Sequence, residues 1–197
     1  MSNRKQKQPT RDKISWRPGT MVYPAPAAIV TVGADPSEWN MLTIAWTGTV
    51  CSDPAMLFIS VRPSRHSYPL LLRQMEFTLN LTTEEMAHAT DWVGVRSGAQ
   101  YDKWKETGLT PLPGDKVASP TIVQSPLSIE CRVKEVVRLG SHDMFSADVL
   151  NVRADKRWID PATGAFSLKD AGLLVFSHGA YYGLGDLIGR FGFSVKK

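Results

Sequence analysis

Residues 127–154 read LSIECRVKEVVRLGSHDMFSADVLNVRA, and this stretch decides the fold class. Its two halves, 127–139 and 144–154, are rich in Val, Ile and Leu, as strands are. Gly140, Ser141, His142 and Asp143 stand between them, and a connection of this length joins the strands of a hairpin. The stretch therefore predicts two long antiparallel strands with a turn at 140–143.

Further strands are predicted on both sides of this hairpin. They are apolar or β-branched runs bounded by turn residues, and they cover 27–32, 41–49, 56–61, 77–81 and 173–177. The run at 56–61 is almost continuously apolar, which predicts burial on both faces. Short helices are expected at 67–75, 82–93 and 101–107, the second opened by a capping box from Thr82 to Glu85. The proline-rich stretch 109–126 is expected to be a surface loop.

The order of these elements determines the predicted architecture. Strands dominate, and the long alternation of strand and helix that a doubly wound parallel sheet requires is absent from the sequence. We therefore predict a mainly β fold, a closed or partly closed antiparallel barrel with a few peripheral helices. This pattern alone does not indicate a function.

The chain has 197 residues, 43% of them hydrophobic and 21% charged, which indicates one ordinary globular domain. Its net charge of +4 arises at the N-terminus, where residues 1–17 carry six basic side chains against Asp12 alone. We expect residues 1–17 to form a disordered basic tail and residues 18–197 to form the domain. Because a nucleic-acid-binding protein should be basic on its folded body, nucleic acid is not an expected partner.

Membranes, export and metals are not expected either. No apolar run approaches the roughly 20 residues that span a bilayer, and the N-terminus lacks the apolar segment of a signal peptide. Cys51 and Cys131 lie far apart and the four histidines have no ligand spacing, so we expect neither a disulfide framework nor a metal site. A cytoplasmic protein is the expectation that remains.

Two short segments carry the candidate chemistry, because the common catalytic and phosphate-loop motifs are absent from the sequence. In the first, residues 46–53 (WTGTVCSD), a strand end passes into small and hydroxyl residues that suit the edge of a flat heterocycle. In the second, arginines and serines precede a predicted helix and suit a phosphate: Ser60, Arg62, Ser64, Arg65 and Ser67. Taken singly, each segment is more often an ordinary turn or a solvated loop.

One predicted strand separates the two segments, and a strand spans roughly 15–20 Å. That is the order of the long dimension of flavin mononucleotide (FMN). The combined sequence, LTIAWTGTVCSDP at 42–54 and FISVRPSRHS at 58–67, resembles the FMN-binding core of the flavin reductase-like family, and within it the flavoredoxins. Further similar segments bring the resemblance to about residues 18–197: 77–81, 97–110, 129–131, 140–143 (with Ser141 in place of the family's Asp) and 181–195.

The resemblance implies a split β-barrel with Greek-key-like antiparallel strands, usually a homodimer, that binds FMN near the dimer interface. By position, it implies that Trp46, Thr47, Thr49, Val50 and Cys51 line the isoalloxazine ring. It implies that Ser60, Arg62, Ser64, Arg65 and Ser67 hold the ribityl and phosphate end. It also implies a place beside the flavin for Asn80, a charge at the phosphate for Lys103, and a possible catalytic contact with flavin or nicotinamide for His142. Cys51 is not expected to be redox-active, because it has no resolving thiol in sequence.

Three functional hypotheses follow. The first is an NAD(P)H:flavin oxidoreductase, in which the flavin performs the hydride chemistry and no protein nucleophile is required. The second is an FMN electron carrier of the flavoredoxin kind, reduced by a redox partner protein. The third is an FMN-binding protein without turnover. One phosphate-binding segment predicts FMN rather than FAD, and the aromatic, glycine-rich residues 179–195 strengthen the expectation of a homodimer.

Overall fold

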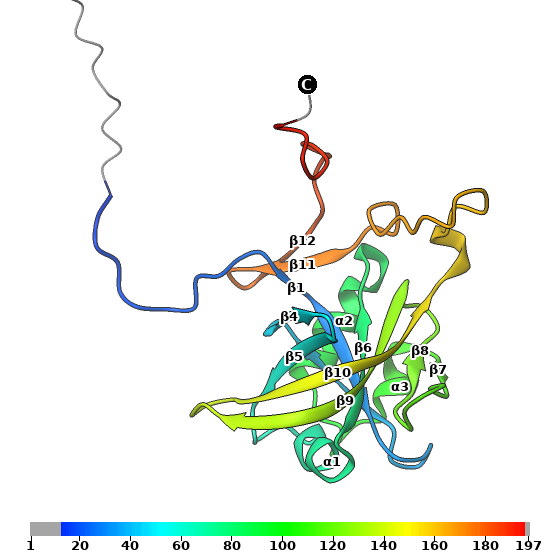
Figure 1. Cartoon of the computed structure of the whole chain (residues 1–197). Helices are drawn as coiled ribbons and strands as arrows, with labels where there is room; N and C mark the ends of the chain where they lie inside the picture. The colour runs from blue at the N-terminus through cyan, green and yellow to red at the C-terminus, as the bar shows by residue number, and fades with distance from the viewer. Residues whose placement is uncertain (1–12, 196–197) are drawn as a thin grey trace, which may run out of the picture.

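The computed structural model describes residues 13–195, so most of the expected basic tail lies outside the described residues. The predicted hairpin is confirmed: β9 (Leu127–Arg138) and β10 (Asp143–Ala154) pair antiparallel. Two register shifts, after Ser146 and after Val149, interrupt the pairing, and such bulges bend a long hairpin. Figure 1 shows the hairpin crossing the barrel, with its tip reaching past the body.

β9 and β10 belong to a seven-stranded antiparallel sheet of order β3-β2-β6-β9-β10-β5-β4. Its other strands are β2 (Ala28–Val32), β3 (Asn40–Ile44), β4 (Thr47–Ser52), β5 (Ala55–Val61) and β6 (Glu76–Leu81). Two small sheets flank it, made of β1 (Ala25–Pro26), β11 (Leu174–Ser177) and β12 (Ala180–Gly183), and of β7 (Pro111–Leu112) and β8 (Thr121–Ile122). The mainly β, antiparallel fold class is confirmed.

The barrel stays open along one seam, between residues 42–45, which end β3 and follow it, and residues 60–62, which end β5 and follow it. β3 and β4 are the two edge strands of the sheet, and Ala45 and Trp46 connect them directly. The Ser60 N–H donates to the Trp46 carbonyl at 2.9 Å, beyond the last pair of β4 and β5. The prediction of one strand over 41–49 is therefore wrong, because the chain leaves one edge of the sheet at Ala45 and joins the opposite edge at Thr47.

The apolar sequence of residues 56–61 predicts that β5 is buried on both faces, but only one face is buried. Leu57, Ile59 and Val61 are buried, whereas the alternate residues Phe58 and Ser60 are only half-buried. Successive side chains of a strand point to opposite faces, and the outer face of β5 is incompletely covered. In β2, near the other edge of the sheet, all five residues are buried.

The short helices lie where the sequence predicts them. They are α1 (Ser67–Gln74), α2 (Ala87–Val95) and α3 (Lys103–Thr107), with 3₁₀ turns at Glu84–Met86 and Lys156–Trp158. The expected capping box is not formed, because the Thr82 hydroxyl donates instead to the Ala27 carbonyl at 2.8 Å. α3 is capped by Asp102, which accepts from two backbone N–H groups, and it ends at Gly108 with φ of 67°.

Two apolar clusters fill the two faces of the central strands. Alternate residues of β2 join different clusters: Val30 packs with Phe77 and Phe145, while Ile29 packs with Met41 and residues of α2. β2 therefore connects the barrel interior with the helical layer. Among the described residues, no helix is long and apolar enough to cross a membrane.

The proline-rich stretch 109–126 is packed into the protein rather than lying free on its surface. Val117, Ser119, Thr121 and Ile122 are buried, and the Ile122 N–H donates to Asn80 Oδ1 at 3.0 Å. The prolines and the glycine of this stretch correctly predict that it forms no long helix or strand. They do not indicate that part of it is buried. The stretch is held by polar side chains in β6 and β9, not by apolar periodicity.

We expect Asn80→Ala to lower the free energy of unfolding by about 2–3 kcal/mol, because each buried group left without a partner costs roughly 1–3 kcal/mol. The Asn80 amide donates to the Ile29 carbonyl and the Thr31 hydroxyl, and its oxygen accepts from Ile122 and Ser128. Urea unfolding measures the change, with the exposed Gln100→Ala as control. A loss below about 0.5 kcal/mol, the range of surface substitutions, would contradict this role.

Candidate functional site

A groove runs along the seam of the barrel. It consists of three adjoining hollows of about 380, 330 and 210 Å³. Arg65 lines all three hollows, and the middle one shares Leu42 and Arg62 with the first and Thr43 and Phe176 with the third. The hollows therefore form one continuous groove, which is within the size range of small-molecule sites.

One end of the groove is cationic. The hollow of about 380 Å³ brings together five residues that the sequence predicts at a phosphate: Arg62, Ser64, Arg65, Ser67 and Lys103. They come from the loop after β5, the first turn of α1 and the start of α3. His66 and Arg96 also line this hollow. Arginine and lysine side chains converging on one small space favour a group of double negative charge, such as a phosphate.

Lys103 is buried at this end in spite of its charge, with 5% of its surface exposed. Its Nζ donates to the carbonyl oxygens of Met41 and Val93, at 2.9 and 2.8 Å. Burial, and to a lesser extent the positive charge of Arg65, lower the pKa of Lys103 from 10.5 to about 8. An anion in the hollow would oppose both effects and stabilise the charged amine.

The opposite end of the groove is aromatic. Trp46 and Phe176 line the middle hollow, and the Tyr23 ring lies 6.1 Å from each of them between ring centroids. In the hollow of about 210 Å³, Tyr181 donates from Oη to Asp91 at 3.3 Å. Burial, together with Asp91, raises the pKa of Tyr181 to about 12, so its phenol stays neutral. This end suits an uncharged flat group.

His142 reaches the middle hollow from the tip of the β9–β10 hairpin. Its Nδ1 lies 2.9 Å from the Ser141 hydroxyl. Partial burial, followed by the positive charges of Arg62 and Arg65, lowers the pKa of His142 below its usual 6.5, which keeps the ring neutral at pH 7. The next residue, Asp143, is buried and accepts a hydrogen bond from the Tyr68 hydroxyl of α1, which fastens the tip to the helix.

The residues predicted at the ring separate into two groups. Trp46 lines the middle hollow, as does Ser60, which was predicted at the ribityl and phosphate end and lies outside the cationic hollow. Thr47, Thr49, Val50 and Cys51 lie farther along β4, outside the three hollows of the groove. Thr47 donates its hydroxyl to the Phe58 carbonyl, and Val50 is 52% exposed. Their contact with a ring stays a prediction, since one chain alone does not bring them into the groove.

Asn80 does not lie with the other predicted site residues. It is fully buried in β6, and both its amide nitrogen and its oxygen already bond to protein groups. The expectation that it lies beside the flavin disagrees with this placement, because no polar atom of the side chain is left for a ligand. Both cysteines are free, and burial raises the pKa of Cys131 to about 12.

Several lining residues were not found from the sequence. Leu42, Phe176, Tyr181 and Arg96 all line the groove. Leu42 looks like any strand residue, and Phe176 and Tyr181 come from strands far along the chain. Arg96 offered a signal, since it precedes Ser97-Gly98 in a segment similar to the family. The guanidinium of Arg96 lies over the Tyr101 ring, 5.4 Å from its centroid.

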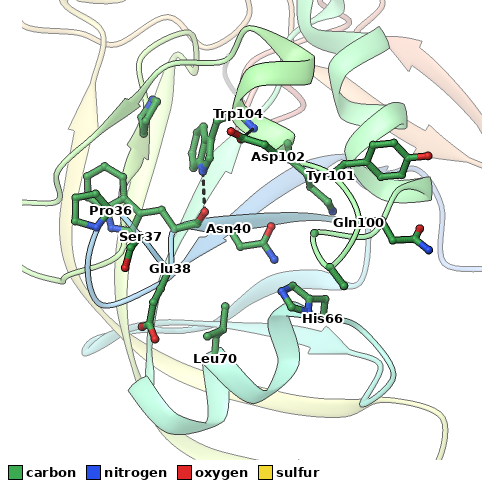
Figure 2. A pocket seen from close by; sticks show the side chains of 15 residues that line it. Pro36, Ser37, Glu38, Asn40, His66, Leu70, Gln100, Tyr101, Asp102 and Trp104 are labelled. Atoms are coloured by element: carbon green, nitrogen blue, oxygen red, sulfur yellow. Dashed lines mark hydrogen bonds between the residues drawn. The ribbon is translucent and has the colours of Figure 1, made fainter.

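A fourth hollow adjoins the groove. It measures about 760 Å³ and lies beside the cationic end, with which it shares His66, Gly98 and Lys103 (Figure 2). It is larger than any one of the three hollows of the groove. Arg62, Arg65 and His142 line the groove and not this hollow, while Lys103 lines both, so the groove offers the better place for an anionic, flat ligand.

The comparisons with known proteins agree with this geometry. The family model described as "Flavin reductase like domain" matches residues 20–185. The chain is similar in structure to the flavoredoxin of Desulfovibrio vulgaris (Miyazaki F), with a TM-score of 0.85 and 25% identity over 94% of this chain and 100% of that one. An FMN-binding protein from Thermus thermophilus has the same fold, with a TM-score of 0.73 and 23% identity over 88% and 96% of the two chains.

A relative whose name states an activity has a similar sequence identity to this chain. The NADH:riboflavin 5′-phosphate oxidoreductase of Streptomyces pristinaespiralis is 24% identical over 153 residues, which is 75% of this chain and 79% of that protein. The family match covers most of the chain and includes every strand that forms the groove. On this evidence the chain belongs to the flavin reductase-like domain family.

Proposed function

We propose that the protein is an FMN-dependent oxidoreductase that passes electrons from NAD(P)H to flavin. One observation carries this proposal: the groove is cationic at one end and aromatic at the other, and its middle hollow joins the two ends. FMN has the matching distribution, with a phosphate at one end and an uncharged ring system at the other. The named relative, a riboflavin 5′-phosphate oxidoreductase, supports this choice of cofactor and donor.

The residues of the cationic end would hold the phosphate. Arg62 and Arg65 offer charged N–H donors, and Lys103 offers its remaining N–H from a buried position. The hydroxyls of Ser64 and Ser67 add neutral donors at the same hollow. Because Arg65 also lines the other two hollows, it would contact the ligand beyond its phosphate.

The residues of the middle hollow would serve the ring. Trp46 and Phe176 exclude water from one end of it, and Ser60 supplies a hydroxyl. His142 presents a neutral imidazole, which can form a hydrogen bond without adding a charge beside the ring. When bound, the flavin supplies the hydride and electron chemistry, so the chain needs no nucleophile of its own.

A second candidate is an FMN electron carrier reduced by a partner protein. The similarity to a flavoredoxin over 94% of the chain favours it. The two candidates differ in how bound FMN responds to a nicotinamide: an oxidoreductase is reduced by it directly, whereas a carrier stays oxidised until its protein partner is added.

We expect the purified protein to bind FMN and to lose the visible absorbance of oxidised flavin when NADH or NADPH is added anaerobically. The Arg62→Ala/Arg65→Ala double variant should bind FMN at least about 100-fold more weakly, since each charge-assisted contact contributes roughly 1.5–3 kcal/mol. Fluorescence titration measures the affinity. Absence of FMN binding by the wild type would refute the proposal, and FMN that stays oxidised would favour the electron carrier.

FMN affinity should fall as the pH rises above about 8, where Lys103 of the free protein loses its proton. A bound phosphate favours the protonated amine and raises its pKa, so binding takes up a proton in this range. The dissociation constant should rise by up to about tenfold per pH unit. Lys103→Met should bind more weakly at pH 7 and lose this dependence, whereas the exposed Lys105→Met should keep it. A flat wild-type curve would contradict the role of Lys103.

We also propose that two copies form a dimer. The segment after β12 exposes large apolar side chains, among them Ile188 at 94% and Phe191 at 105%. Figure 1 shows this segment leaving the barrel on the same side as the N-terminal arm, which exposes Trp16 and Val22. Apolar surface of this extent marks an interaction site. A second copy of the chain fits the family resemblance and would cover both segments.

Light scattering should give twice the mass of one chain for the wild type and the mass of one chain for Ile188→Glu/Phe191→Glu. Both side chains are exposed, so the substitutions should leave the barrel folded. Leu139→Glu, an exposed position on the hairpin (61%), is the matched control and should remain dimeric. A wild type of single-chain mass at micromolar concentration would contradict the dimer.

A further inference from the structure

The tip of the β9–β10 hairpin, which carries His142, is exposed. Residues 139–141 all lie on the surface, and Gly140 turns the chain with φ of 106°. The turn is closed by the Leu139 N–H, which donates to the His142 carbonyl at 3.1 Å. Segments with so little burial move readily relative to the rest of a protein. His142 lines the middle hollow, so something must hold the tip against the barrel.

Asp143 joins this exposed tip to the sheet. It is the first residue of β10, and its backbone pairs with Val61 of β5 and with Arg138 of β9. Its side chain is buried, and the carboxylate accepts a hydrogen bond from the Tyr68 hydroxyl. Because a buried carboxylate without a partner is costly, this bond strongly favours one position for the residue next to His142.

Tyr68 is itself held by contacts outside the hairpin tip. Its ring lies edge-on to Phe145 of β10, with 5.8 Å between the ring centroids. The neighbouring Ser67 accepts from Asn40 Nδ2 at 3.0 Å, and Leu71, one turn later in α1, is fully buried. Figure 1 shows α1 below the hairpin. The helix is therefore the fixed side of the Tyr68–Asp143 bond, and the tip is the side that moves if the bond is lost.

The protonation of Tyr68 suits this bond. The hydrogen bond to Asp143, followed by burial of the phenol, raises the pKa of Tyr68 above its usual 10, so the hydroxyl remains a donor at neutral pH. Hydrogen bonds to a charged acceptor are stronger than neutral ones. An amide in place of the carboxylate would still accept from Tyr68, whereas an aliphatic side chain would not.

We infer that Tyr68 and Asp143 are positioning residues that hold the imidazole of His142 at the middle hollow of the groove. Neither residue lines the three hollows, so they act through the turn that carries His142. The inference rests on the proposed function for the role of His142 beside the ring. The position of the imidazole, however, is measurable in the protein without any ligand.

An NMR titration of the full chain without ligand follows the His142 imidazole, whose signal is assigned with His142→Gln. Burial, and then the positive charges of Arg62 and Arg65, which line the middle hollow with it, lower the pKa of His142 below its usual 6.5. Tyr68→Phe and Asp143→Val release the tip, so the pKa should rise toward 6.5. Loss of the Asp143 charge by itself would lower the pKa, so a rise reports movement of the ring.

Asp143→Asn and Tyr182→Phe are the matched controls, and both should keep the lowered pKa of His142. The first retains an acceptor for Tyr68, and the second removes a hydroxyl from an exposed ring outside the groove. Thermal melting shows which variants are folded. The two disruptive substitutions remove opposite partners of the bond, and Asp143→Val leaves no buried charge behind. If neither of them folds, the pair is structural and the inference is overturned.

FMN binding tests whether the position of His142 matters to the site. In a fluorescence titration, Tyr68→Phe should raise the dissociation constant for FMN about three- to tenfold, the size of one hydrogen bond. The same substitution in the His142→Ala background should change it less than about twofold, because His142 transmits the effect. A general loss of structure would weaken FMN binding equally in both backgrounds.

An unchanged pKa of His142 in both disruptive variants would overturn the inference. So would an effect of Tyr68→Phe on FMN binding that is absent, or that is equal with and without His142. If the wild type does not bind FMN, or if His142→Ala leaves FMN binding unchanged, the proposed role of His142 beside the ring fails. The NMR titration then decides by itself whether Tyr68 and Asp143 position the imidazole.

Discussion

The hydrogen bond from the Ser60 N–H to the Trp46 carbonyl is the point at which the two sides of the barrel part. The strands β4 and β5 pair as far as Thr47 and Ile59. The residues before Ala45 belong to β3, which lies at the other edge of the sheet. A fully paired barrel would leave its interior filled by side chains and its rim as the only place for a ligand. Because 42–45 and 60–62 diverge here, their side chains line a groove instead.

The groove is arranged around charges that the protein alone does not balance. Arg62, Arg65 and Arg96 line the same hollow as the buried Lys103, whose amine bonds only to carbonyl oxygens among the described residues. Burial of this amine, and to a lesser extent the positive charge of Arg65, disfavour its charged form in the free chain, and the lowered pKa of Lys103 expresses that cost. Binding sites often carry such local conflicts, which a ligand of opposite charge relieves.

The sequence predicts the strands and the cationic end well, because both depend on local patterns. β-branched runs and their turn residues mark the hairpin, and two arginines next to serines mark the loop before α1. The crossing at Ala45 was missed since its residues are as apolar as those of the strands beside it. Asn80 was misplaced for a related reason: its partners Ile29, Ile122 and Ser128 come from three distant segments, and no local pattern reports such a network.

Arg65 has a place in the groove that no other residue shares, because it lines all three hollows while its Nη1 bonds to the Gly94 carbonyl of α2 at 2.8 Å. Groups bound at the two ends of the groove are therefore not energetically independent. A ligand group that shifts the Arg65 guanidinium at one end of the groove changes the N–H donors offered at the other end. The same shift strains the bond from Arg65 to the Gly94 carbonyl near the end of α2. Binding energies of ligand fragments measured separately should not add up to that of the whole ligand, and the difference measures the coupling that one side chain transmits.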